Sequence, residues 1–147
     1  MTKEVLVSVK GTQLMGEEND TIEIITSGTC YEKNGKQYIL FEEAIGDAGD
    51  VTRNTVKIEP DKVEVTKRGL VESHMTFECG KKNMANYVTP VGLIILGLTT
   101  ASLTVTENEK EIHIGINYSL EMNGEYISDC SLEILAKARE KGGLHLT

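Results

Sequence analysis

Apolar and polar residues alternate along most of the chain, with the period of two that is typical of β-strands. The pattern begins with Val5, Val7 and Val9, and its longest later runs lie at 70–79 and 112–120. In each run one face is apolar and the other polar, as expected of strands that cover a core on one side. The pattern predicts an all-β protein.

Short turns separate the alternating segments. Asn34-Gly35 and Asn123-Gly124 are typical of two-residue hairpin turns, because asparagine and glycine accept positive φ angles. Further turns are expected at Pro60-Asp61, at 80–83 and at 89–92. Strands joined in sequence by short turns form antiparallel, up-and-down sheets.

A long sheet with one apolar face hides that face by closing into a barrel or by folding into a sandwich. We expect a single domain over residues 1–147, built as one antiparallel up-and-down barrel of 8–10 strands. The segment 131–141 fits either a helix capped by Gly142 or the end of the last strand. We favour a strand to about Leu135, followed by a short helical turn.

Composition restricts the function. The chain has 23 acidic and 15 basic residues, a net charge of −8, 5% aromatic residues and no tryptophan. Nucleic acids and anionic membrane surfaces are therefore disfavoured as partners. The N-terminus lacks the apolar region of a signal peptide, and no segment is long and apolar enough to cross a bilayer. Cys30, Cys79 and Cys130 are expected to be reduced and to point inward, in a cytoplasmic protein.

Several short strings, in this order, carry a family resemblance: 55–59, 62–69, Glu72-Ser73, Phe77, Gly80, Tyr87-x-Thr89-Pro90-x-Gly92, and 114–125. Together they resemble the YwiB-like bacterial proteins of unknown function. The resemblance implies a lipocalin-like (calycin-type) β-barrel in a small cytoplasmic bacterial protein, with no established activity and no catalytic residues to transfer. The apolar residues at 91 and 93–96 depart from the family pattern.

The chain offers no arrangement that points to catalysis. His74, His113 and His145 have no second ligand at the spacing of a metal motif, and there is no Gly-x-Ser-x-Gly nucleophile turn. The acidic segment 46–50 is unsuited to cradling a phosphate. We therefore expect no catalytic residues, no metal and no cofactor, and we do not expect an enzyme.

The first functional hypothesis is a binding module. The small residues Gly28, Ser73, Gly97 and Ala101 are expected to point inward, among aliphatic side chains. They could leave room in the barrel for a small apolar or amphipathic ligand, although side chains alone can also fill a barrel of this size. Arg68 and Tyr118 are candidate polar contacts to that ligand.

One carboxylate of the pair Glu42-Glu43 must point into the barrel, because neighbouring strand residues face opposite sides. A register with Tyr38 and Leu40 inside selects Glu42, and a register with Ile39, Phe41 and Ile45 inside selects Glu43. The inward carboxylate would pair with Arg53 or Arg68. Glu42 is accordingly the third candidate ligand contact.

The second hypothesis is a module for protein interaction or assembly, with neither ligand nor catalysis. Residues 93–98 are apolar on both strand faces, so one row cannot simply face water. Taking Ile94, Leu96 and Leu98 as the outward row, we expect a homodimer or a partner contact there.

Overall fold

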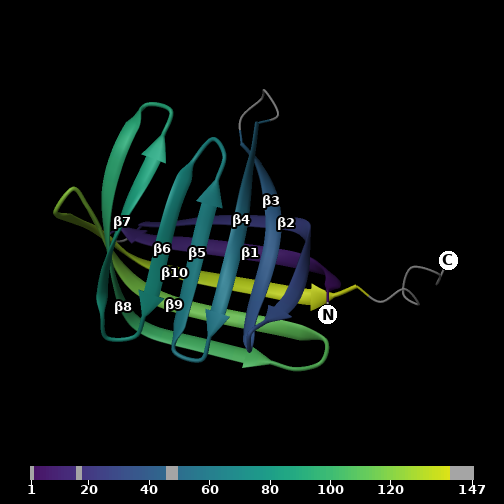
Figure 1. Ribbon diagram of the computed structural model, residues 1–147. Helices are drawn as coiled ribbons and strands as arrows, with labels where there is room; N and C mark the ends of the chain where they lie inside the picture. Colours follow the sequence, from purple (N-terminus) through teal and green to yellow (C-terminus); the bar gives the residue numbers. More distant parts are fainter. Residues whose placement is uncertain (1, 16–17, 46–49, 140–147) are drawn as a thin grey trace.

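The computed structural model describes residues 2–15, 18–45 and 50–139 as a closed, ten-stranded barrel (Figure 1). The strands are β1 (Lys3–Met15), β2 (Glu18–Lys33), β3 (Lys36–Ile45), β4 (Asp50–Glu59), β5 (Lys62–Arg68), β6 (Glu72–Glu78), β7 (Lys82–Thr89), β8 (Gly92–Glu107), β9 (Glu111–Met122) and β10 (Glu125–Ala138). In this described part, no helix is long and apolar enough to cross a membrane. The predicted all-β, up-and-down barrel is confirmed.

Each strand pairs antiparallel with the next strand in sequence, and β1 pairs with β10 to close the barrel. The two Asn-Gly turns have the expected backbone, with φ of 54° at Asn34, 75° at Gly35, 50° at Asn123 and 88° at Gly124. Four positive values match the predicted hairpin type. β10 remains a strand to Ala138, so the helical alternative for the last described segment is wrong up to that residue. Gly142 lies outside the described residues.

Aliphatic side chains fill the middle of the barrel. Val7, Ile39, Val56, Val63 and Ile114 have no measurable exposure, and the core continues through all ten strands. Phe77 and Tyr118 meet in this core with ring centroids 5.0 Å apart. The alternative of a barrel filled by side chains therefore describes its centre, and open space for a ligand must be sought at its ends.

A bulge in β8 decides which apolar residues point inward. Leu96 and Leu98 belong to the buried core, with 6% and 1% exposure, whereas Leu93 and Ile95 are 55% and 41% exposed. The register shifts between Thr100 and Ser102. The predicted outward orientation of Ile94, Leu96 and Leu98 is therefore wrong. These residues face the core because their cross-strand neighbours on β7 and β9, among them Ala85 and Leu120, line it.

Four small residues were predicted to point inward, and two of them lie on the outer face instead. Gly97 lies opposite Met84 and Glu121, and an added Cβ there would meet Lys82 and Glu121. Ala101 is exposed at the bulge. Gly28 and Ser73 do face inward.

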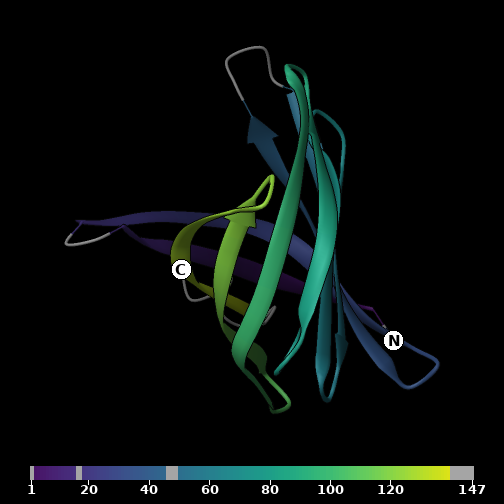
Figure 2. The ribbon, with the colours of Figure 1, turned by 90° about the vertical axis from the view of Figure 1, so that its left-hand side faces the viewer.

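Strand β2 separates from β3 part-way along its length. It pairs with β3 only from Gly28 to Lys33, while its pairing with β1 continues to the hairpin end. We call the point at Gly28 the fork. Figure 2 shows the β1–β2 hairpin projecting past the fork, away from the upright strands of the barrel. At the fork, the Thr26 hydroxyl still reaches the backbone oxygen of Glu42 at 3.4 Å.

The cysteines differ in accessibility. Cys30 and Cys130 are buried as predicted, but Cys79 is exposed, because β6 ends at Glu78 and places Cys79 in the following turn. Burial raises the pKa of the Cys30 thiol to about 11.

These environments predict that a thiol reagent at pH 8 modifies one cysteine of the native protein rapidly. At that pH only about one Cys30 thiol in a thousand is ionised, and the thiolate is the reactive form. Cys79→Ser should abolish the fast phase, and unfolding the wild type should expose all three thiols. Rapid modification of two or more thiols in the native protein would contradict this assignment.

Candidate functional site

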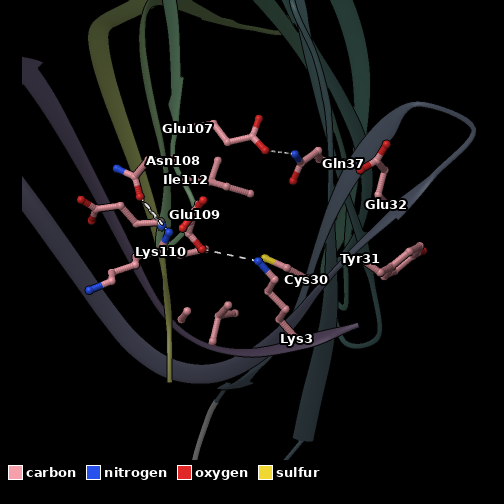
Figure 3. A pocket seen from close by; sticks show the side chains of 14 residues that line it. Lys3, Cys30, Tyr31, Glu32, Gln37, Glu107, Asn108, Glu109, Lys110 and Ile112 are labelled. Carbon is pink, nitrogen blue, oxygen red and sulfur yellow. Dashed lines mark hydrogen bonds between the residues drawn. The ribbon is translucent and has the colours of Figure 1, made fainter. Parts of the chain in front are cut away.

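A hollow of about 190 Å³ opens at one end of the barrel, which we call the barrel mouth (Figure 3). Its floor consists of the buried side chains of Val5, Cys30, Ile112 and Ala136, contributed by four different strands. These residues face inward because each belongs to the alternating inner set of its strand. The mouth is thus the point where the apolar interior meets solvent.

The turn between β8 and β9 forms one side of the rim and is held by its own hydrogen bonds. The Asn108 side-chain oxygen accepts from the backbone N–H of Lys110 at 2.8 Å and of Glu111 at 3.0 Å. The backbone N–H of Ala138 donates to the carbonyl oxygen of Lys110 at 2.7 Å, which ties the turn to β10. The rim is therefore shaped before any ligand arrives.

Charged side chains surround the mouth. Four glutamates, Glu32, Glu107, Glu109 and Glu111, and two lysines, Lys3 and Lys110, line the mouth, so its lining residues carry a net charge of −2. The Gln37 side-chain amide donates a hydrogen bond to Glu107, and Lys3 Nζ donates to the backbone oxygen of Glu109 at 3.4 Å (Figure 3). The field at the mouth favours a cation over an anion.

A second polar group of residues lies inside the opposite end of the barrel. Cross-strand pairing aligns Asn54 with Lys67, Lys67 with Ser73, and Ser73 with Tyr87, and places Glu43 on the same inner wall. We call these five residues the inner polar row. Lys67 Nζ lies 2.8 Å from both Glu43 Oε1 and Asn54 Oδ1, and Asn54 Nδ2 donates to Glu43 Oε1 at 3.0 Å.

Burial and pairing compete in this row. Burial acts to raise the pKa of the Glu43 carboxyl, but the hydrogen bond and charge of Lys67 and the Asn54 amide outweigh it, so this pKa lies below its ordinary value. Burial, with the nearby charge of Glu43, raises the pKa of the Tyr87 phenol. The hydroxyls of Thr52 and Ser73 are buried here and have no hydrogen-bond partner among the residues that the structure describes. The row is a structural polar network in which Lys67 and Asn54 satisfy the buried Glu43 carboxylate.

Two of the three predicted ligand contacts, Glu42 and Arg68, come together, but on the outer wall, and Tyr118 lies apart from them. Glu42 lies on the outer wall, where Arg53 Nε approaches its carboxylate at 3.3 Å, and the exposed Arg68 is the cross-strand neighbour of Arg53. Glu42 and Arg68 thus line one hollow of about 900 Å³ on the outer wall, while Tyr118 is inside, against Phe77. Placing Glu42 and Arg68 inside was wrong. The alternative register for β3 is the observed one, and the inward Glu43 pairs with Lys67 rather than an arginine.

Sequence reasoning missed the mouth because no local signal marks it. Its lining comes from β1, β2, β3, β8, β9, β10 and the β8–β9 turn, and no two of these segments share a motif. The hairpin turns that fix the register could have been used to place Cys30 and Ile112 at one barrel end.

A family model for a domain of unknown function, DUF1934, matches residues 7–134. The chain belongs to the DUF1934 family. The match spans all ten strands in whole or in part, so the family domain and the barrel are one unit. None of the proteins with curated descriptions matches this chain.

The crystal structure of the ywiB protein from Bacillus subtilis is similar to this barrel, with a TM-score of 0.84 and 23% sequence identity. The similarity covers 95% of this chain and 94% of the other. It confirms the fold and, together with the family match, the predicted membership of a YwiB-like family of unknown function.

Proposed function

We propose that this DUF1934 protein binds a small amphipathic molecule at the barrel mouth, with a short apolar part on the floor and a cationic group at the rim. One observation carries the proposal: a hollow with a floor of the buried side chains Val5, Cys30, Ile112 and Ala136 opens at the barrel end between charged rim residues. Sites for small molecules usually combine an apolar lining with a few polar groups that fix orientation.

The size of the mouth limits the ligand. Its volume of about 190 Å³ is below the roughly 300–1,000 Å³ of sites that enclose a drug-sized molecule. The floor therefore suits a short aliphatic segment, either a whole small molecule or one end of a longer one. The filled core between Ile39 and Ile114 prevents deeper entry.

The rim charge selects the head group. The negative charges of four rim residues attract a primary ammonium group and repel a carboxylate: Glu32, Glu107, Glu109 and Glu111. The probes that follow are n-hexylammonium and hexanoate, which share an alkyl chain and differ in the sign of the head group.

Calorimetric titration and thermal unfolding should detect n-hexylammonium at millimolar concentration and show much weaker binding of hexanoate. Replacing Glu32 and Glu109 with lysine should weaken binding of n-hexylammonium about tenfold, which corresponds to ~1.4 kcal/mol. The matched control replaces Glu72 and Glu125 with lysine, which changes the net charge equally at exposed positions outside the mouth lining. Equal effects of the two double variants, or binding of neither probe, would refute the proposed site.

A further inference from the structure

The projecting hairpin leaves one edge of the sheet open. From Asn19 to Ile25, β2 pairs with β1 on one side, and no described strand pairs with its other side. Backbone N–H and C=O groups along such an edge are free to pair with another strand. A hollow of about 560 Å³ lies at the fork, lined by Thr26 and Glu42, so the described residues leave space beside the end of this edge.

This edge has only part of the usual protection against strand addition, namely the acidic side chains of Asp20 and Glu23. Natural edges are commonly interrupted by lysine, proline or a bulge, and Asn19–Ile25 contains none of these. It carries three β-branched isoleucines instead, of which Ile22 is 70% and Ile25 63% exposed. Both exposures are high for large apolar side chains on a strand, and strand addition would cover them.

The sequence of the edge is compatible with itself in one antiparallel arrangement. A two-fold axis at Ile22 places Ile22 opposite Ile22 of a second copy, Thr21 opposite Glu23, and Asp20 opposite Ile24. Neither acid then faces an acid directly, although the segment contains two acids and no base. Parallel in-register stacking would oppose every acid to itself, so the charges favour a closed pair over an open-ended stack.

We propose that two copies of this chain associate through antiparallel pairing of their β2 edges over Asn19–Ile25, with the two-fold axis at Ile22. The pairing would continue the β10–β1–β2 sheet of one barrel into β2–β1–β10 of the next and cover both open edges at once. A closed two-fold interface of this kind leaves no further edge of β2 for a third copy.

The decisive variants are Thr21→Glu and Thr21→Lys, measured by sedimentation equilibrium. Thr21 is exposed, so either side chain fits the fold, and its cross-strand neighbour on β1 is the uncharged Thr12. In the dimer, residue 21 of each copy faces Glu23 of the other copy, so the two-fold axis produces this pair two times. The glutamate variant should therefore dissociate about tenfold more readily than the lysine variant.

Leu93→Glu is the matched control, since Leu93 is 55% exposed on the outer face of β8, the surface near which sequence reasoning placed a dimer contact. It should leave association unchanged. Ile22→Cys in a Cys79→Ser background should form a disulfide-linked dimer on mild oxidation, because the remaining native thiols are buried. A wild-type monomer at high concentration, equal effects of the two Thr21 variants, or loss of association in Leu93→Glu would overturn the proposal.

Discussion

Gly28→Ala should destabilise the protein by about 3 kcal/mol. A Cβ at this position would lie 2.5 Å from the backbone oxygen of Leu40 and 2.8 Å from a methyl group of Val7. The first of these atoms belongs to a paired strand and cannot move away without breaking the β2–β3 ladder. Overpacking a tight interior typically costs about 1–3 kcal/mol, and a clash with backbone falls at the upper end. Urea unfolding followed by circular dichroism measures the change.

Gly11→Ala is the matched control, because Gly11 is also a strand glycine, and a Cβ there would meet nothing within 4 Å. Gly11→Ala should leave stability unchanged or raise it by up to about 1 kcal/mol, since alanine loses less backbone freedom on folding than glycine. If both variants lose the same stability, the loss in Gly28→Ala reflects the strand propensity of the residue and not the close approach of the backbone at the fork.

Lys67→Met should destabilise the protein by about 2 kcal/mol at neutral pH. The variant keeps the volume of the side chain but leaves the Glu43 carboxylate without its ammonium partner, in a site where that carboxylate is 13% exposed. Removing one partner of a fully buried pair costs about 3–5 kcal/mol, and the partial exposure of both groups reduces this. Asn54, which would still donate to Glu43, also limits the loss.

The pH dependence of this variant should be opposite in sign to that of the wild type. The folded wild type holds the pKa of Glu43 below the ordinary value of 4.5, so its contribution is present above that pH and is lost as the pH falls through the lowered value. Without Lys67, burial raises the pKa of Glu43, and lowering the pH should stabilise the variant relative to its value at neutral pH. Chemical unfolding from pH 7 down to about pH 3, which includes the range below 4.5 where the wild type loses this contribution, compares the two proteins.

Lys57→Met provides the control for the loss of a positive charge. Lys57 pairs with Glu64 on the outer wall at 3.7 Å, where such pairs contribute about 0–1 kcal/mol. A loss as large in Lys57→Met as in Lys67→Met would assign the effect to net charge, not to the inner polar row.

The strand order of the barrel was predictable because local signals agree along most of the chain. The valines of β1 alternate inward as expected, and both Asn-Gly turns adopt the positive φ angles that their residues allow. Turns that join neighbouring strands leave few topologies open. Pairing of β1 with β10 then closes the barrel, because closure removes the apolar face of the sheet from water.

Which face is inner was less predictable where both faces are apolar. In β8 the run Leu93–Leu98 has no period of two, and the bulge between Thr100 and Ser102 reverses the alternation within one strand. Glu42 and Glu43 posed the same ambiguity, which Lys67 on β5 resolves by pairing with Glu43. These outcomes depend on register between strands, and alternation within a strand cannot supply it.

The barrel mouth could not be predicted for a different reason. Cys30 and Ile112 are ordinary inward residues of their strands, and only closure brings them to the same opening. The mouth forms only where the ends of six strands and the β8–β9 turn meet in the closed barrel.

The β1–β10 seam has a consequence for the order of folding. Each of the other nine neighbour pairings joins strands that are consecutive in sequence, but the seam pairs Val5 with Ala138. The loop-closure entropy of such a distant contact exceeds that of a four-residue turn by about 3 kcal/mol. The hairpins should therefore form first, and the curled sheet should pass through a stage in which β1 and β10 are both unpaired along one side. Refolding rates should consequently be set by closure of the seam, and substitutions in the hairpin turns should change them less than substitutions along it.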